Sequence, residues 1–425
     1  MRQSFPLTKY LDLDSLASSI AYAWIQTEVH KKPTIPFMQI ERNDLSLRAE
    51  NIYAFKLAGL DDPGNQLLFV TDLAGIKPFP SQQFALVDHN RLGPSFASGN
   101  PTAQVVGVVD HHEDENLYTD TANPRTIAPA GSCTSHVAGL CPPEVPAELA
   151  TLLLCGIFID TGGLKPGGKA LQVDREAASF LVSRSTYANS LPPKLLTQLS
   201  NDPKSKTDIL CEVRAVKDLT NELLTKKFDV SHLGAWDLLR RDYKEYIHKL
   251  PWAPSEPSIK VGLSTVPVGL ESWGTEGRLA KEAQSWMKHR GLSVHGVLTS
   301  FRDEKKLGKS GKGKHRREMV WLVRKDVEIL PGSGSEMAGG LDFNDLASRL
   351  WKGLEDNKEL KLKKHKKFDI DKEGNLSATM KTKVYEQRNV NATRRAIAPI
   401  LKTILENSTP PPLPVPGSPA AQETK

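Results

Sequence analysis

Aspartate closes each of three short apolar runs in the first 160 residues of the chain, at Asp88, Asp110 and Asp160. Short runs of Val, Ile, Leu and Phe are typical of strands that are buried on both faces of a parallel sheet. Ligands of open parallel sheets gather just beyond the carboxyl ends of the strands. We therefore expect Asp88, Asp160 and His111, which follows Asp110, to share one crevice.

A pair of aspartates, Asp12 and Asp14, precedes these runs. Because one residue separates them, both side chains point to the same side of an extended segment. Together with Asp88, His111 and Asp160 they make a set of carboxylates and one imidazole, which suits Mn²⁺ or Mg²⁺ better than zinc. This many carboxylates favours two ions, as in hydrolases that activate a shared water for in-line displacement.

The neighbours of His111 are expected to have other roles. Adjacent residues of an extended segment face opposite ways, so His112 is expected to reach a substrate phosphate oxygen or the leaving group, as donor or general acid. The alternative is that His112 is hydrogen-bonded beside the metal ligands and contacts neither metal nor substrate. Asp110 is expected to hold the imidazoles rather than bind metal, which leaves His112 and Asp88 as the predicted catalytic residues.

The order of four motifs carries a family resemblance. Asp-Leu-Asp-Ser begins at Asp12, Val-Asp-His-Asn surrounds Asp88, Val-Val-Asp-His-His ends at His112 and Ile-Asp ends at Asp160. In this order the motifs resemble the DHH phosphoesterase superfamily, in the branch with a second, DHHA2 domain. That branch holds family II inorganic pyrophosphatases, fungal exopolyphosphatases and animal prune proteins, and the resemblance extends to about residue 406.

The resemblance implies an α/β fold, with a parallel-sheet DHH domain followed by a smaller mixed α/β DHHA2 domain. It also implies a set of metal ligands, which are Asp12, Asp14, Asp88, His111 and Asp160.

Three further elements resemble the family. The turn at residues 130–135 resembles one that opens a helix near the metal site. Residues 391–396 resemble the Ser/Thr-Arg-Lys-Lys element of the DHHA2 domain, which implies that Arg394 and Arg395 hold substrate phosphates. Residues 242–245 resemble the family's substrate-binding lysine element and add Lys244, for which an exposed helical lysine is the alternative.

The N-terminus departs from the family pattern. Four residues before the first aspartate, pyrophosphatases carry histidine and exopolyphosphatase-like or prune-like members usually carry asparagine, whereas this chain has Thr8. Residues 1–10 also lack the apolar first strand and the Gly-Asn turn of the family. We therefore expect this central strand to be short or absent, with Asp12 and Asp14 anchored only from their helix side.

Composition indicates a soluble two-domain protein, because 39% of its 425 residues are hydrophobic and 25% are charged. The apolar runs are too short for a membrane span, the start of the chain has no secretion signal, and the four cysteines lack disulfide or zinc spacing. We expect a cytoplasmic protein with the following organisation: a catalytic domain at 1–200, a linker at 201–225, a substrate-binding domain at 226–408 and a disordered Pro-rich tail at 409–425 with an unknown protein partner.

In the second half of the chain, apolar patterns predict a mixed α/β domain. The strands are expected at 259–266, 292–300 and 319–323, and the helices at 277–289, 343–354 and 391–405.

The charge pattern bears on the substrate. Two basic blocks, at 305–317 and 358–367, suggest an acidic partner, with solvated loops as the alternative. We expect a phosphoanhydride hydrolase, first an exopolyphosphatase that releases terminal phosphate from inorganic polyphosphate. An inorganic pyrophosphatase, a prune-like nucleotide phosphodiesterase and an inactive polyphosphate-binding module are the alternatives, and neither a membrane nor a specific nucleic acid is an expected partner.

Overall fold

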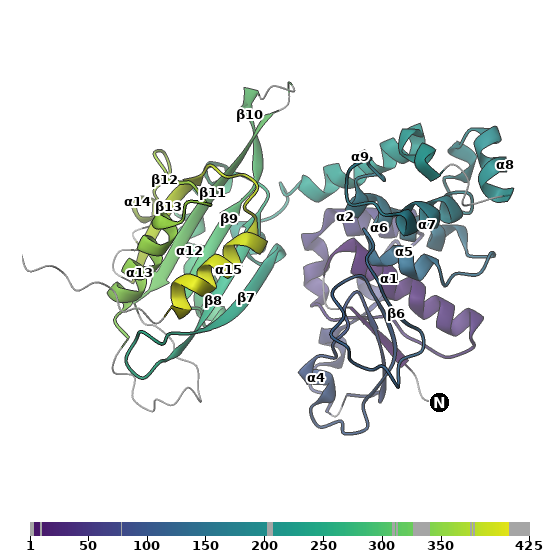
Figure 1. Ribbon diagram of the computed structural model, residues 1–425, viewed down its shortest axis with the longest axis horizontal. Coiled ribbons are helices and arrows are strands. Elements are labelled where there is room, and N and C mark those ends of the chain that lie inside the picture. Colours follow the sequence, from purple (N-terminus) through teal and green to yellow (C-terminus); the bar gives the residue numbers. More distant parts are fainter. Residues whose placement is uncertain are drawn as a thin grey trace, which may run out of the picture. The chain divides into compact units, whose positions relative to one another are not determined.

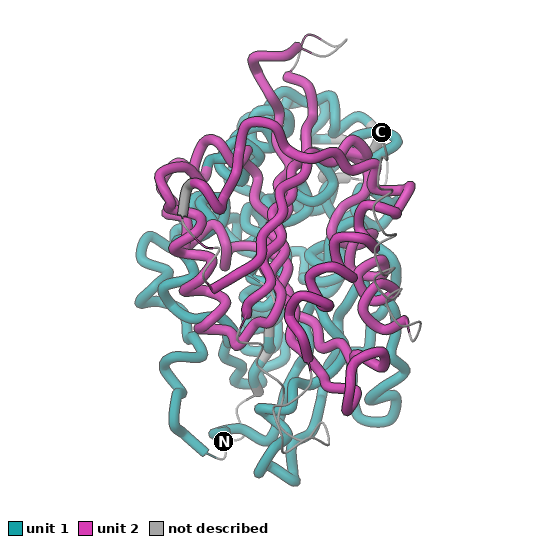
Figure 2. Tube along the Cα trace, turned by 90° about the vertical axis from the view of Figure 1, so that its left-hand side faces the viewer, with its two compact units in different colours: residues 1–229 teal, residues 230–425 magenta. Residues whose placement is uncertain are grey.

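The computed structural model describes residues 4–8, 11–77, 79–201, 207–307, 311, 313–325, 341–374, 376 and 379–407. The chain divides into two compact units, residues 1–229 and residues 230–425 (Figure 2). The predicted Pro-rich tail lies outside the described residues. Within the ranges given above, no helix has the length and apolar character needed to cross a membrane.

The first unit is built on a parallel sheet with the strand order β3-β2-β1-β4-β5-β6. Its strands are β1 (Ser4–Thr8), β2 (Phe37–Met38), β3 (Leu68–Phe69), β4 (Gln83–Val87), β5 (Gln104–Asp110) and β6 (Arg125–Ile127). Its α-helices are α1 (Leu13–Trp24), α2 (Ala49–Leu57), α3 (Pro63–Gln66), α4 (Pro94–Ala97), α5 (Cys133–Ala138), α6 (Ala147–Thr161), α7 (Gln172–Val182), α8 (Pro193–Asn201) and α9 (Arg214–Phe228).

Each face of this sheet has its own core, because alternate residues of a strand point to opposite faces. On one face, Ala85 and Val87 of β4 pack in a large cluster with helices α1, α2, α5 and α6 (Figure 1). On the other face, Phe84 and Leu86 pack in an aromatic cluster that includes Phe96 of α4. The sheet is therefore held in place from both sides.

The N-terminal residues form the central strand, so the expectation that this strand is short or absent is wrong. β1 pairs in parallel with β2 on one side and with β4 on the other. Phe5 and Leu7 are 4% and 0% exposed and belong to the aromatic cluster. Two apolar residues at alternate positions fill one face of a five-residue strand, and a search for a continuous apolar run overlooks them. Asp12 and Asp14 are thus anchored by a strand ahead of them as well as by helix α1.

The run that precedes Asp160 is helical, so its assignment to a parallel strand is wrong. Residues 156–159 lie in α6, which is buried from Leu149 to Ile159. A helix that is apolar on all sides is buried in a core, and a short apolar run does not distinguish it from a buried strand. Asp160 therefore projects from the last turn of a helix.

The segment assigned to a linker, residues 201–225, includes most of a helix of the first unit, α9. Val216, Leu219 and Leu223 of α9 recur at helical spacing and are buried in the same cluster as α1 and α6. The boundary between the two units follows Asp229.

The second unit has a mixed sheet with the strand order β12-β13-β11-β9-β8-β7, and β10 pairs with β11. Its strands are β7 (Tyr243–Lys249), β8 (Ser258–Val266), β9 (Val294–Thr299), β10 (Phe301–Leu307), β11 (Gly313–Arg324), β12 (Leu362–Lys364) and β13 (Met380–Gln387). Its α-helices are α10 (Ala235–Arg241), α11 (Leu270–Trp273), α12 (Arg278–Arg290), α13 (Phe343–Asp356), α14 (Ile370–Gly374) and α15 (Arg394–Glu406).

Helices cover both faces of this second sheet. One cluster joins α12 and α14 to inward residues such as Val297 and Val320, and the other joins α13 and α15 to residues such as Trp321. The strands predicted in the second half are found as β8, β9 and part of β11, and the predicted helices are found as α12, α13 and α15. Lys244 lies on strand β7, so the alternative of a helical lysine is wrong.

Leu7→Ala tests the central position of β1. We expect the free energy of unfolding of the first unit to fall by about 2–5 kcal/mol, because the substitution leaves a cavity in the aromatic cluster. Urea unfolding measures this loss. Ile76→Ala, at a side chain of the same unit that is 49% exposed, is the control and should cost much less; equal effects would contradict the buried strand.

Candidate metal centre

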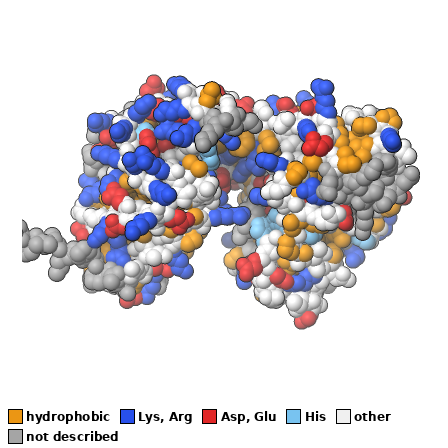
Figure 3. Space-filling view, turned by 45° about the horizontal axis from the view of Figure 1, so that its top comes forward, with side chains coloured by type: hydrophobic (Ala, Val, Ile, Leu, Met, Phe, Trp, Pro, Cys, Tyr) orange, Lys and Arg blue, Asp and Glu red, His pale blue; other side chains and the backbone are white. Residues whose placement is uncertain are grey.

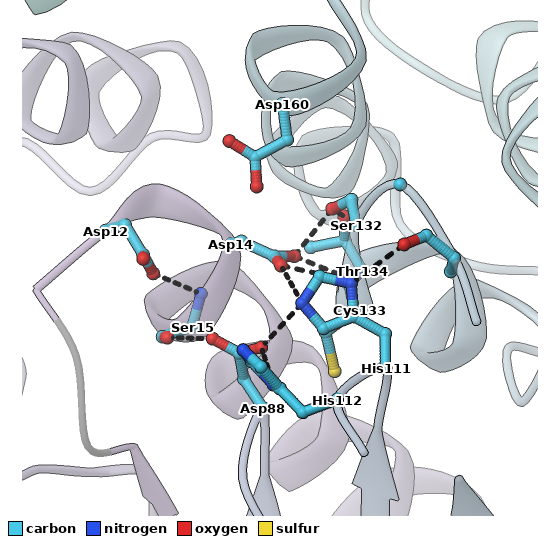
Figure 4. A network of polar contacts seen from close by, with 12 residues as sticks. Asp12, Asp14, Ser15, Asp88, His111, His112, Ser132, Cys133, Thr134 and Asp160 are labelled. Carbon is cyan, nitrogen blue, oxygen red and sulfur yellow. Dashed lines mark hydrogen bonds and ion pairs between the residues drawn. The ribbon is translucent and has the colours of Figure 1, made fainter. Parts of the chain in front are cut away.

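Acidic and imidazole side chains from separate elements converge at the carboxyl end of the parallel sheet (Figure 4). Asp12 and Asp14 lie at the start of α1, which follows β1, while Asp88 follows β4 and His111 follows β5. The strand order reverses between β1 and β4, and ligand sites of open α/β sheets form at such a switch point.

Asp14 is a buried carboxylate that is held by the N-terminal turn of α5. Its oxygens accept hydrogen bonds from the Ser132 hydroxyl at 2.6 Å and from the backbone N–H groups of Cys133 and Thr134 at 2.9 and 2.8 Å. These N–H groups have no partner inside their own helix. Burial, and next the charge of Asp88, raises the pKa of Asp14 to about 7. The carboxylate is therefore fixed in position, and the charged group that opposes its negative charge is the His111 imidazole, 3.7 Å away.

Asp88 has a left-handed backbone conformation, with φ of 63°, which is uncommon for residues other than glycine. One carboxylate oxygen, Oδ2, accepts a hydrogen bond from the Ser15 hydroxyl. The other, Oδ1, is buried at 3.2 Å from Nε2 of His111, and no described residue donates a well-aligned hydrogen bond to it. Burial also raises the pKa of Asp88. A buried carboxylate oxygen without a donor is costly, and a bound cation would remove that cost.

His111 directs one ring nitrogen at these carboxylates. Its Nδ1 lies 3.1 Å from the carbonyl oxygen of Ala130, and its Nε2 lies 3.2 Å from Asp88 and 3.7 Å from Asp14. Donation of Nδ1–H to a backbone carbonyl leaves the Nε2 lone pair available to a metal. Burial lowers the pKa of His111, but its close contact with Asp88 and the negative charges of Asp14 and Asp88 outweigh burial and raise the pKa to about 9.

His112 is held by Asp110, which is fully buried. Nδ1 of His112 lies 2.8 Å from Oδ1 of Asp110, and the second oxygen of Asp110 accepts a hydrogen bond from Asn90 at 2.6 Å. The two imidazole rings lie 4.6 Å apart, and Asp88, His111 and His112 each offer a ligand atom within 4.8 Å of the others. We expected His112 to face away from His111, as neighbouring residues of a strand do. Its ring lies close to the cluster instead, because Nδ1 is held by Asp110.

Asp12 and Asp160 border the cluster on other sides. Asp12 caps α1 by accepting a hydrogen bond from the Ser15 N–H at 3.2 Å, and Asp160 extends from α6 toward Asp14 (Figure 4). Burial, and next the charge of Asp14, raises the pKa of Asp160 to about 7. Lys227 of α9 lies 3.8 Å from Asp160. The sequence did not point to this lysine, because residues from 226 onward were assigned to the substrate-binding domain and not to the domain that carries Asp160.

An open pocket of about 810 Å³ adjoins Asp88 and His112. Its wall includes the loop after β4, residues 89–94, and the loop after β5, residues 113–115. Arg91 and Glu115 form an ion pair on this wall. The pocket leaves space beside His112 for a group larger than one phosphate.

Three of the predicted substrate-binding residues, Lys244, Arg394 and Arg395, lie in the second unit, whereas His112 lies in the first. Arg394, at the start of α15, donates hydrogen bonds to the backbone carbonyl of Asp242 at 2.9 Å and to its carboxylate at 2.7 Å. This pair brings the elements around Lys244 and Arg395 side by side, although they are far apart in the sequence. Arg395 is exposed, and Lys and Arg side chains gather on one face of this unit (Figure 3).

The basic blocks are not simple loops where the structure describes them. Lys305 and Lys306 end β10, residues 313–317 begin β11, and β12 lies inside the second block.

Without divalent metal, the melting temperature of the first unit should fall as the pH rises from about 5 to about 8. The pKa values of Asp14 and Asp160 are raised from 3.8 to about 7, so each stabilises the fold at low pH and loses this contribution as the pH passes 7. The pKa of His111 is raised from 6.5 to about 9, so the stability that protonated His111 contributes is lost as the pH rises between these two values. Thermal unfolding with EDTA measures the fall, and Mn²⁺ should remove most of it; a flat profile with EDTA would contradict this charge balance.

Over most of its length the chain resembles a solved structure in fold. The crystal structure of a Methanococcus jannaschii protein, named "putative family II inorganic pyrophosphatase", superposes with a TM-score of 0.50 at 15% sequence identity. The match covers 95% of this chain and 99% of that chain. The α/β fold, with a parallel sheet followed by a mixed sheet, is confirmed.

Relatives are found by sequence as well. A Schizosaccharomyces pombe protein named "Putative exopolyphosphatase" is 29% identical over 315 residues, which cover 69% of this chain and 71% of that protein. The mouse "Exopolyphosphatase PRUNE1" is 27% identical over 297 residues, which cover 68% of this chain and 58% of the mouse protein. A Streptococcus mutans "Probable manganese-dependent inorganic pyrophosphatase" is 30% identical over 168 residues, 36% of this chain and 46% of that protein. The chain thus spans less than two thirds of the mouse and streptococcal relatives.

Two domain families match consecutive parts of the chain. The DHH family, N-terminal domain, matches residues 7–157, and the DHHA2 domain matches residues 221–404. The first match contains Asp12, Asp14, Asp88 and His111, and the second contains Lys244, Arg394 and Arg395. The chain belongs to the DHH superfamily, in the branch that carries a DHHA2 domain.

Proposed function

We propose that this chain is a metal-dependent hydrolase of phosphoanhydride bonds and that it releases terminal phosphate from inorganic polyphosphate. The cluster of Asp14, Asp88 and His111 carries the proposal, because it concentrates buried negative charge around an imidazole nitrogen oriented for a metal. The names of the relatives, exopolyphosphatase and manganese-dependent pyrophosphatase, support the same class of reaction.

Divalent cations fit the residues that are present. Buried Oδ1 of Asp88 has no well-aligned donor among the described residues, and the donor set of carboxylates with one imidazole suits Mn²⁺ or Mg²⁺. Two ions at this site would supply Lewis-acid activation of a water molecule and would neutralise charge on the phosphoryl group. The residues that would hold them are Asp12, Asp14, Asp88, His111 and Asp160.

His112 is assigned to the leaving group. Asp110 fixes its Nδ1, and nearly half of the side chain is exposed, 48%, beside the open pocket. The hydrogen bond to Asp110 raises the pKa of His112, so the ring keeps its proton over more of the neutral range. In this position His112 can donate a proton or a hydrogen bond to the departing phosphate oxygen.

Polyphosphate is preferred over pyrophosphate as the substrate for two reasons. The relative named exopolyphosphatase aligns with 69% of the chain, against 36% for the relative named pyrophosphatase. The second unit also offers Lys244, Arg394 and Arg395 together with further basic side chains, which a long polyanion would contact. Cations of this kind supply the electrostatic stabilisation that phosphoryl transfer needs.

Phosphate release from long-chain polyphosphate and from pyrophosphate, with Mn²⁺ or Mg²⁺, tests the proposal. We expect faster release from polyphosphate and its loss in Asp88→Asn, which removes a charge from the metal cluster. Asp72→Asn is the matched control, because Asp72 accepts a hydrogen bond from Phe69 and pairs with Arg42 away from the cluster. Phosphate release from pyrophosphate alone would show that pyrophosphate, and not polyphosphate, is the substrate. Release from neither compound would contradict the proposal that the chain is an enzyme of this class.

Arg395→Ala tests the phosphate-binding role of the second unit. The side chain is exposed at the start of α15, so its loss should raise KM for polyphosphate about tenfold with a smaller change in kcat, as expected for one charged contact. Steady-state kinetics at low and high salt measure this, and the difference from wild type should shrink at high salt. Lys352→Ala, at an exposed lysine of α13, is the control; equal effects of the two substitutions would point to general charge attraction instead.

A further inference from the structure

Asp174 of α7 is a fully buried carboxylate, 0% exposed, for which the proposed reaction has no direct use. Its Oδ2 accepts hydrogen bonds from the N–H groups of Gly131 at 2.8 Å and Leu171 at 2.7 Å. Its Oδ1 accepts from the N–H of Ser132 at 3.3 Å and from the hydroxyl of Ser135 at 2.6 Å. Three of the four donors thus belong to one short segment, residues 131–135, which forms the turn into α5 and its first residues.

The same turn holds Asp14 from its other side. Ser132 donates its backbone N–H to Asp174 and its hydroxyl to Asp14, and the next two N–H groups, of Cys133 and Thr134, point to Asp14. The N–H groups of the turn are therefore divided in sequence, first to Asp174 and then to Asp14. A shift of the turn would move the donors of both carboxylates together.

Close packing leaves the turn little freedom. A Cβ atom on Gly131 would lie 2.7 Å from the Thr161 side chain and 2.8 Å from Oδ2 of Asp174. Thr161 ends the same helix, α6, that carries Asp160. The turn is thus fixed between Asp174 and the last turn of α6.

We propose that Asp174 is a positioning residue that sets the affinity of the metal centre by fixing the turn at residues 131–134, which in turn orients the carboxylate of Asp14. The proposal rests on the proposed function in that Asp14 is taken as a metal ligand. Asp174 itself touches neither metal nor substrate. Groups that orient a ligand in this way typically change metal affinity by about 10–100-fold when they are removed.

Mn²⁺ titration of the purified full chain, followed by the electron paramagnetic resonance signal of free Mn²⁺ well below the melting temperature, tests the proposal. We expect Asp174→Ala to weaken Mn²⁺ binding by about 10–100-fold. Asp174→Asn keeps one oxygen acceptor for two of the N–H groups and should retain more affinity than Asp174→Ala. Ser135→Ala removes only the hydroxyl contact and should cost about two- to fivefold.

Asp72→Asn is the control for general destabilisation, because Asp72 also accepts a backbone N–H group in the first unit but does not contact the turn. It should leave Mn²⁺ affinity unchanged. Hydrogen exchange of the metal-free protein gives a second measure, and the amides of residues 131–134 should exchange faster in Asp174→Asn than in wild type.

A purely structural role for Asp174 would give a different result. If Asp174→Asn and Ser135→Ala lower the melting temperature but bind Mn²⁺ as tightly as wild type, the proposal is overturned. If the Asp174 variants do not fold, the affinity of Ser135→Ala decides, and an unchanged value overturns the proposal. Wild-type chain that binds Mn²⁺ but releases no phosphate would remove the proposed function while leaving the role of Asp174 intact.

Discussion

Buried negative charge at the carboxyl end of the parallel sheet is the constraint on which the site depends. Asp14 and Asp88 are each 2% exposed, and burial raises the pKa of both carboxyls. Hydrogen bonds from Ser15 and from the start of α5 fix the carboxylates in place but do not neutralise them. Nε2 of His111 faces the same space, so the arrangement is stable at neutral pH only with protons or cations between these groups.

The fold supplies this arrangement through its topology. β1 and β4 are neighbours at the point where the strand order reverses, and their carboxyl ends direct the chain into Asp12 and Asp88 respectively. Helices α5 and α6 then add the turn that holds Asp14 and the carboxylate of Asp160. Grouping acidic side chains destabilises the fold, and the apolar clusters on both faces of the sheet stabilise the unit against this cost.

The alternating apolar runs and the order of the acidic motifs predicted the α/β class, and Asp14, Asp88 and His111 lie close together as expected; the metal-ligand roles of these residues stay a prediction. Asp12 and Asp14 lie at the start of α1, Asp88 follows β4 and His111 follows β5, and the apolar patterns of these three elements are visible in the sequence. Asp160 was placed near the site for the wrong reason, since residues 156–159 are equally apolar in a buried helix and in a buried strand. β1 was missed because only Phe5 and Leu7 mark it as apolar. Asp174 gave no signal at all, because its role depends on a turn about forty residues away in the sequence and on no motif of its own.

Anomalous diffraction at the manganese edge from crystals grown with Mn²⁺ tests the central claim most directly, because it locates the ions without reference to any substrate. We expect two anomalous peaks among Asp12, Asp14, Asp88, His111 and Asp160, about 3.5–4 Å apart as in two-metal hydrolases, with Nε2 of His111 coordinated to one of the ions. If crystals grown with excess Mn²⁺ show no anomalous peak at Asp14 and Asp88, the assignment of a metal centre to these residues is contradicted.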